Sequence, residues 1–139
     1  MLRPARAGRQ AERALGARVS IGFYRGTHSK YNAIPTRCNQ GQFHHSKLEA
    51  NRCDELHVLQ AGGILSELKA HPQPAYPLVV NGHKLCSYVA DFEYVDADGN
   101  VVTEDTKGFR TEVYKLKAEL FLALYGREVR EVTRTRGRR

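Results

Sequence analysis

Two acidic residues and a lysine stand at the end of a predicted strand, in the segment VVTEDTKGFR at 101–110. Side chains alternate between the two faces of a strand, so Asp105 and Lys107 share one face while Glu104 points to the other. The preceding predicted strand, KLCSYVADFEYV, carries Asp91, and the turn DADGN folds the two strands together. This pairing brings Asp91 close enough to Asp105 for both carboxylates to reach one ion.

This set of side chains suits metal-assisted hydrolysis of a phosphodiester. Mg²⁺ (or Mn²⁺) binds through one or two carboxylates and keeps several waters, one of which it activates. Lys107 would orient the attacking water or neutralise the charge that develops on phosphorus. Glu49, in the predicted helix, offers a third carboxylate. Two simpler interpretations remain open: Glu49 only caps the helix, and Asp91 forms an ion pair with Lys107 without a metal.

The elements that must position these residues follow from turn and capping signals. SKLE is a capping box that starts a helix at Ser46, with Glu49 at its third position, and Gly62 ends it. A short hairpin or loop precedes this helix and turns at 39–41. Leu48, Leu56 and Leu59 form the apolar face of the helix.

The second half of the chain predicts a meander and another helix. Prolines at 72, 74 and 77 forbid a helix and indicate an irregular segment leading into an edge strand. NG at 81–82 is a tight turn into the strand that carries Asp91. A helix is expected from about 111 to 125, capped by Gly126, and REVREV predicts a further short strand. The order predicts one α+β (α/β) domain.

The second predicted helix has an apolar stripe that we expect to be buried. Its members recur at helical spacing. They are Val113, Leu116, Leu120 and Leu124.

The positive charge is concentrated at the two ends of the 139-residue chain. Residues 1–18 hold five Arg and one Glu, and residues 127–139 hold six Arg and two Glu, so each end carries +4. The formal net charge of the whole chain is +7, so the residues between the two ends carry a net charge of −1. We expect a disordered basic arm at 1–28 and a basic tail at 133–139, both suited to phosphate contacts. A purely solubilising role for these ends is the alternative.

Other sequence features exclude several classes of protein. No apolar run is long enough to span a membrane, and the N-terminus has no apolar signal region, which predicts a cytoplasmic protein. Three cysteines without a CxxC motif predict reduced thiols rather than a disulfide framework. His83 and Cys86 have a metal-like spacing, but no second pair of that kind is present, so no structural zinc is expected.

Four segments resemble a known family. SKYNA, FHHSKLEA, YVADFEY and EDTKGFRTEVYKLK look like signature segments of small phage-encoded proteins of the PD-(D/E)XK nuclease superfamily, formerly described as a domain of unknown function. The resemblance covers residues 29–132 and implies a restriction-endonuclease-like core. Matching positions place the catalytic residues at Glu49, Asp91, Asp105 and Lys107, with the three acids as metal ligands. The superfamily proline before the strand acid is replaced by Ala90.

The resemblance also implies a substrate and further site residues. The chain is similar in motif order to phage endonuclease I, a dimeric enzyme that cuts branched DNA and Holliday junctions. This similarity implies a DNA endonuclease that works as a homodimer. Gln73 is expected to line the site, and Glu104 is the alternative acid. Predicted DNA contacts come from the helix entrance and the segment after Lys107; they are His44, His45, Arg110, Lys115 and Lys117. The competing hypothesis is a non-catalytic nucleic-acid-binding protein whose acids form a structural ion-pair network.

Overall fold

The computed structural model describes residues 33–134. The predicted arm at 1–28 lies outside the described residues, as does the predicted tail beyond residue 134, so the disorder expected there stays a prediction. No helix in the described part of the chain is long and apolar enough to cross a membrane.

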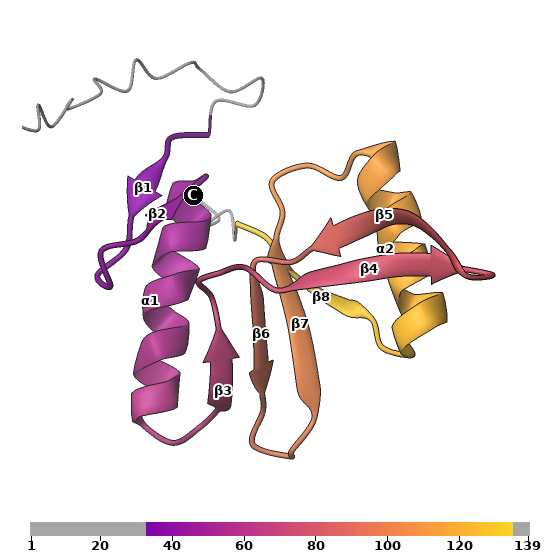
Figure 1. The fold of residues 1–139 in the computed structure, drawn as a ribbon. Coiled ribbons are helices and arrows are strands. Elements are labelled where there is room, and N and C mark those ends of the chain that lie inside the picture. The colour runs from indigo at the N-terminus through magenta and orange to yellow at the C-terminus, as the bar shows by residue number, and fades with distance from the viewer. Residues whose placement is uncertain (1–32, 135–139) are drawn as a thin grey trace, which may run out of the picture.

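Within residues 33–134, two helices and three sheets of two to four strands form an α+β fold, as predicted. The elements in chain order are β1 (Thr36–Arg37), β2 (Phe43–His44), α1 (Lys47–Ala61), β3 (Ser66–Lys69), β4 (Ala75–Val80), β5 (His83–Val89), β6 (Phe92–Val95), β7 (Val101–Thr106), α2 (Glu112–Tyr125) and β8 (Val129–Val132). Figure 1 shows α1 and the small β1–β2 hairpin on one side of the sheet formed by β3, β6, β7 and β8.

The central sheet has the order β3-β6-β7-β8. β6 pairs antiparallel with both β3 and β7, whereas β7 and β8 run parallel and are connected through α2. The turn at 96–100 produces the predicted hairpin, with Phe92 opposite Glu104 and Glu93 opposite Thr103. The expected last strand, REVREV, is therefore present as β8.

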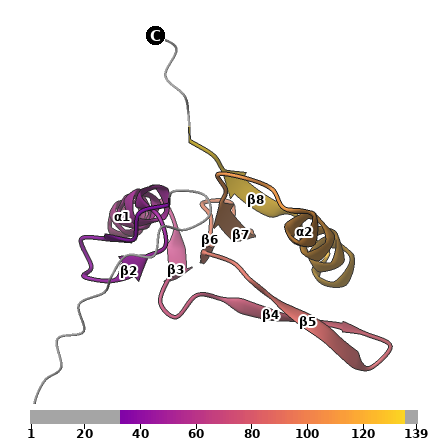
Figure 2. The same cartoon turned by 90° about the horizontal axis from the view of Figure 1, so that it is seen from above.

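The single long strand predicted for KLCSYVADFEYV is wrong, because the chain bends at Ala90 and Asp91. β5 pairs with β4 across the NG turn, where Asn81 and Gly82 both have positive φ angles of 49° and 78°. β6 instead joins the central sheet. Seen from above, the β4–β5 hairpin extends away from that sheet alongside α2 (Figure 2). The bend places Asp91 between two sheets rather than within one.

Two hydrophobic cores hold these layers together. The first lies under α1, where Cys53 and Leu56 pack on Phe92 and Tyr94. Ser46 caps α1 as predicted, since its side chain accepts a hydrogen bond from the Glu49 amide. The second core joins the β4–β5 hairpin to α2 and includes Leu78. β7 is buried on both faces in its second half, at Thr103, Glu104 and Asp105.

The predicted buried stripe of α2 is largely wrong. Val113 is 64% exposed and Leu116 is 60% exposed, and Leu124 is exposed as well, whereas Leu120 is partly buried. The helix instead buries Tyr114 and Phe121, on a face shared with partly buried Ala118 and Tyr125. This aromatic face has the same helical spacing as the leucine stripe, so periodicity alone does not choose between them.

Candidate functional site

Asp91 lies at the bend between β5 and β6, next to the end of β7. Its Oδ2 accepts hydrogen bonds from the backbone N–H and the hydroxyl of Thr106, both at 2.7 Å. The register that pairs Phe92 with Glu104 brings Asp91 level with Asp105 on the neighbouring strand. The hairpin therefore places the two acids side by side, as the sequence predicted.

Asp105 points from β7 into the space between the sheet and the β4–β5 hairpin. Its Oδ2 accepts a hydrogen bond from the Tyr88 hydroxyl at 2.6 Å and lies 2.9 Å from Lys107 Nζ. Its Oδ1 is buried and has no hydrogen-bond partner among residues 33–134. Lys107 also lies over the ring of Tyr114, with Nζ 4.6 Å from the ring centroid. One carboxylate oxygen is thus held in place while the other has no donor from the described residues.

Glu49 and Gln73 complete the row of polar groups. Glu49 uses Oε2 to accept a hydrogen bond from the backbone N–H of His45 at 3.1 Å, so the capping interpretation accounts for only one of its oxygens. Its Oε1 accepts from Gln73 Nε2 at 3.0 Å. The same Nε2 also donates to Asp91 Oδ1 at 3.1 Å. Gln73 therefore bridges the helix acid and the strand acid.

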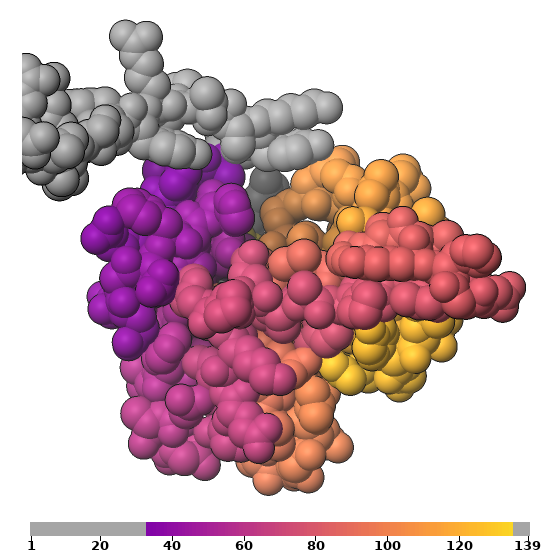
Figure 3. Space-filling view, in the orientation of Figure 1, coloured from indigo at the N-terminus to yellow at the C-terminus, as the bar shows by residue number. Residues whose placement is uncertain are grey.

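A cleft of about 1030 Å³ opens over these residues. Glu49, Asp91 and Lys107 line it, and so does Thr106. In the space-filling view a notch separates the indigo β1–β2 segment from the orange loop after β7, at the end of the molecule where α1 begins (Figure 3). The cleft therefore reaches Glu49 and the half-buried Asp91 from one side, whereas Asp105 lies behind them and is 1% exposed.

Burial and mutual repulsion raise the pKa values of all three acids. Burial raises the pKa of Asp105 to about 7, and the neighbouring charge of Asp91 adds to the effect. Burial is also the largest cause of the raised pKa of Asp91, and the charge of Glu49 raises it further. For Glu49 the main cause is again burial, which outweighs its hydrogen bond from His45. A cation among these carboxylates would remove the repulsion that keeps their pKa values high.

Glu104 faces the opposite side of β7 from Asp105, which agrees with the predicted alternation. It is fully buried rather than directed outward, because α1 covers that face. Arg52 Nε and Nη2 lie 2.5 and 2.9 Å from its two oxygens, and the Tyr94 hydroxyl donates to it at 2.8 Å. Glu104 is thus an ion-pair residue that fixes α1 to the sheet and does not line the cleft.

The predicted DNA contacts fall at different places on the molecule. His45 lines the cleft, but His44 is 4% exposed, so a direct contact between His44 and DNA does not fit the structure. Arg110 is paired with Glu131, and Lys117 donates to the Ser87 carbonyl. Lys115 forms an ion pair with Glu112 on the surface of α2. None of Arg110, Lys115 and Lys117 is among the described residues that line the cleft.

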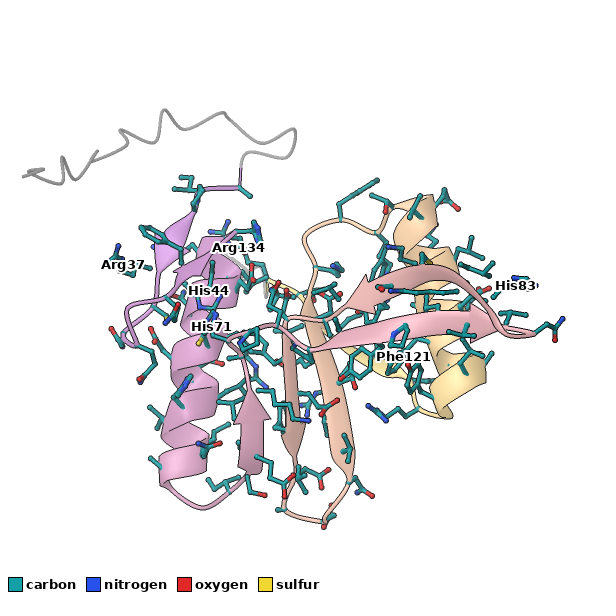
Figure 4. The ribbon with its side chains drawn as sticks, viewed as in Figure 1. Arg37, His44, His71, His83, Phe121 and Arg134 are labelled. Carbon is teal, nitrogen blue, oxygen red and sulfur yellow. The ribbon has the colours of Figure 1, made fainter. Side chains whose placement is uncertain are left out.

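Other polar and basic side chains at the cleft were missed from the sequence. Lys47 and Asn51 come from the first turns of α1, and Arg134 comes from the segment after β8. Figure 4 shows Arg134 at the end of the molecule where α1 begins. The position of Lys47, two residues before Glu49 in the sequence, could have indicated that it lies near the acids. Arg134 is far from the acids in sequence, and only the tertiary fold brings it to the cleft.

Comparison with protein families places the chain in one of them. A family described as "Protein of unknown function (DUF1064)" matches residues 28–137. The chain belongs to this family. The span matched by DUF1064 includes every residue of the cleft described above. Neither the curated proteins nor the solved structures gave a match. The family description assigns no activity to DUF1064, so a function has to be argued from the site.

Proposed function

We propose that this DUF1064 protein is a divalent-metal-dependent DNA endonuclease with a PD-(D/E)XK active site on a restriction-endonuclease-like core. The observation that carries the proposal is the convergence of Glu49, Asp91 and Asp105 beside Lys107, with Glu49, Asp91 and Lys107 lining one cleft and Asp105 directly behind it. These residues come from a helix, a bend between strands and a strand end, and the sequence separates them by up to 58 positions. The order of acids and lysine along the chain is that of the superfamily it resembles.

The donor set fits Mg²⁺ or Mn²⁺. All candidate ligand atoms are carboxylate oxygens, which these hard cations prefer. Asp105 Oδ1 is a buried acceptor without a donor in the described residues, which suits an oxygen that binds a cation. Asp91 and Asp105 would hold the ion, with Glu49 as the third ligand. Bound there, the cation would activate a water and stabilise charge on the phosphate.

The protein side chains around the acids have separate roles in this proposal. Lys107 Nζ, 2.9 Å from Asp105, would orient the attacking water or neutralise the charge that develops on the phosphate oxygens. Tyr88 holds Asp105 in one orientation through its hydroxyl, and Thr106 does the same for Asp91. Gln73 holds Glu49 and Asp91 at a fixed spacing through its two hydrogen bonds.

Basic groups at the cleft and at the chain ends favour a nucleic-acid substrate. Lys47, Arg134 and His45 line the cleft around the acids. The basic residues beyond the described part add positive charge at both ends. Sequence-independent contacts to phosphates need this kind of charge and no particular base-reading element. DNA would thus approach the acids along a basic rim.

The finer proposal is cleavage of branched DNA or Holliday junctions by a homodimer, in phage DNA recombination, replication or packaging. It rests on the resemblance to phage endonuclease I in motif order. A dimer suits a four-way junction because a two-fold axis makes two symmetric cuts. Sedimentation equilibrium on the free and junction-bound protein tests this: a monomer in both states would contradict the dimer.

The decisive experiment is a cleavage assay with full-length protein. Labelled four-way junction, linear duplex and single strand are incubated with Mg²⁺, with Mn²⁺, or with EDTA. We expect cleavage only with a divalent ion, with a preference for the junction, and a decrease of at least about 1000-fold in rate for Asp105→Ala. Asp91→Asn and Lys107→Ala should reduce activity as well, since Asp91 would bind the same cation and Lys107 would act on the attacking water or the phosphate.

Two control variants separate the site from the fold. Glu93→Gln changes a partly buried acid two residues from Asp91 that pairs with Lys69 and Arg127 outside the cleft, and it should still cleave. Asp98→Asn changes an acid in the exposed β6–β7 turn and should behave like the wild type. Tight DNA binding without cleavage under any metal would instead support a non-catalytic binding protein with a structural ion-pair network.

A further inference from the structure

A second group of potential ligands lies in the described region, on the far side of Glu49 from the acids. It consists of two cysteines and two histidines, Cys38, His44, Cys53 and His71. One ligand atom from each of the four lies within 4.8 Å of the other three. They come from the β1–β2 turn, the end of β2, the middle of α1 and the segment after β3. Sequence spacing gave no hint of the group, because its members belong to four separate segments.

Two of the separations between these atoms are close to those of tetrahedral zinc. With Zn–N of about 2.0–2.1 Å and Zn–S of about 2.3 Å, tetrahedral angles place two nitrogens about 3.3 Å apart and a nitrogen and a sulfur about 3.6 Å apart. His44 Nε2 and His71 Nε2 are 3.2 Å apart, and Cys53 Sγ is 3.9 Å from His71 Nε2. The two imidazole rings lie edge to face, with centroids 4.7 Å apart.

The surroundings of the group are those of a closed structural site. Cys38, His44 and Cys53 are buried, whereas His71 is exposed. Figure 4 shows His44 and His71 next to each other beside α1. The Nδ1 atom of His44 faces Glu49 Oε1 at 3.6 Å, in the manner of a carboxylate that supports a metal-bound histidine. His57 Nδ1 bonds the Cys53 carbonyl at 2.8 Å and so is already engaged within α1.

We propose that Cys38, His44, Cys53 and His71 bind one structural zinc ion. Four ligands with no open position suit a structural rather than a catalytic zinc. The ion would join the two-residue strands β1 and β2 to α1 and to the segment that leads to Gln73. Hairpins of that length have little contact area of their own, so a metal contributes much of their stability. The site is independent of whether the neighbouring cleft is a nuclease.

The first test is metal content and coordination of the full-length protein. The chain is expressed with zinc in the medium and purified without chelator, and its metals are measured by mass spectrometry. We expect about one zinc per chain. Replacement by Co²⁺ should give the intense visible absorption of a tetrahedral site and a thiolate charge-transfer band. Zinc-free protein after reconstitution with zinc, or the weak spectrum of octahedral Co²⁺, would overturn the proposal.

Matched variants locate the ion. Loss of a group that only supports a metal ligand weakens metal binding by about 10- to 100-fold, so loss of the ligand in His71→Ala should weaken zinc binding at least that much. Of the four ligands, His71 is the exposed one, so this substitution perturbs the core least. His71→Cys keeps a ligand, so it should keep zinc and strengthen the charge-transfer band. The double variant His83→Ala/Cys86→Ser removes the pair with metal-like spacing on the β4–β5 hairpin and should keep full zinc content.

A further variant separates this site from the acids. Asp105→Ala should retain the zinc even when it abolishes cleavage, so failure of one proposal is distinguishable from failure of the other. Loss of zinc in Asp105→Ala, or in the His83→Ala/Cys86→Ser control, would place the ion elsewhere and contradict the four-residue site. Unchanged zinc affinity in His71→Ala would contradict it as well.

Discussion

At the scale of single residues, the acids beside the cleft lie close together, and burial and mutual repulsion raise their pKa values. Asp105 has a lysine and a tyrosine on one oxygen and no donor from residues 33–134 on the other. Asp91 lies next to Asp105, and Gln73 Nε2 donates hydrogen bonds to both Asp91 and Glu49. Raised pKa values of this kind are common at functional sites, so they support the proposed nuclease site over a structural ion-pair network.

Asp105→Asn should therefore stabilise the metal-free fold. The pKa of Asp105 is raised from 3.8 to about 7, so the folded chain binds the proton more tightly than the unfolded chain does. Stability decreases as pH rises from the unfolded pKa to the folded pKa, and the full penalty is present above about pH 7. Asparagine removes this penalty and still accepts from Tyr88. We expect a melting temperature about 5 °C higher at about pH 8 in buffer without Mg²⁺.

The pH dependence provides the check on this prediction. The difference in melting temperature between Asp105→Asn and wild type should shrink as the pH falls below about 7 and disappear below about pH 3, where Asp105 is protonated in both the folded and the unfolded wild type. Added Mg²⁺ should stabilise the wild type more than the variant. A lower melting temperature for the variant at about pH 8 would mean that the Lys107 ion pair outweighs the burial of the charge.

At the scale of elements, one buried ion pair fixes α1 against the sheet. Arg52 on α1 holds both oxygens of Glu104 on β7, and Glu104 is fully buried. The hydrogen bond to Glu104 is the largest cause of the raised pKa of Arg52, ahead of the opposing effect of burial. Glu49 lies one turn of α1 before Arg52, so this contact also sets the position of the helix acid relative to Asp91.

Arg52→Met should destabilise the protein by about 3–5 kcal/mol, because it leaves the carboxylate of Glu104 buried without a cation. The double variant Arg52→Met/Glu104→Leu removes both charges and should recover most of that stability. Urea unfolding followed by circular dichroism measures both. If Arg52→Met is as stable as the wild type, the pair does not hold α1 in place.

At the scale of the whole molecule, the middle of the chain and its ends have different charge. The two ends carry +4 each, and the residues between them carry −1 in total. Lys47 and Arg134 line the cleft, so a basic rim surrounds the acids. Contacts to phosphates by such groups release counterions and make binding depend on salt. The acids would determine the chemistry, and the Arg-rich ends would contribute affinity.

Replacing Arg136, Arg138 and Arg139 with Gln in the full chain should weaken junction binding and flatten its salt dependence. Each phosphate interaction that the variant removes should reduce the slope of log affinity against log salt by about 0.9. The cleavage rate at saturating DNA should stay unchanged, because the acids and Lys107 are intact. Fluorescence anisotropy over a salt series measures the slope. An unchanged slope would show that the tail does not contact DNA.

The sequence by itself determined the local elements and which residues share a strand face. Capping residues at Ser46 and Gly126 and the NG turn each fix the backbone conformation over a few residues. The start of α1, the end of α2 and the β4–β5 hairpin were therefore predictable. Alternation along β7 is equally local, and it was enough to assign Asp105 and Glu104 to opposite faces.

Only the tertiary structure decided which faces are buried and which distant residues meet. It chose the aromatic face of α2 over the leucine stripe, because Phe121 packs against the β4–β5 hairpin. It bent the chain at Ala90, which placed Asp91 between two sheets. It also brought His71 next to His44, a contact that depends on packing between elements far apart in sequence. Local signals reach only a few residues, whereas these contacts depend on how whole elements pack.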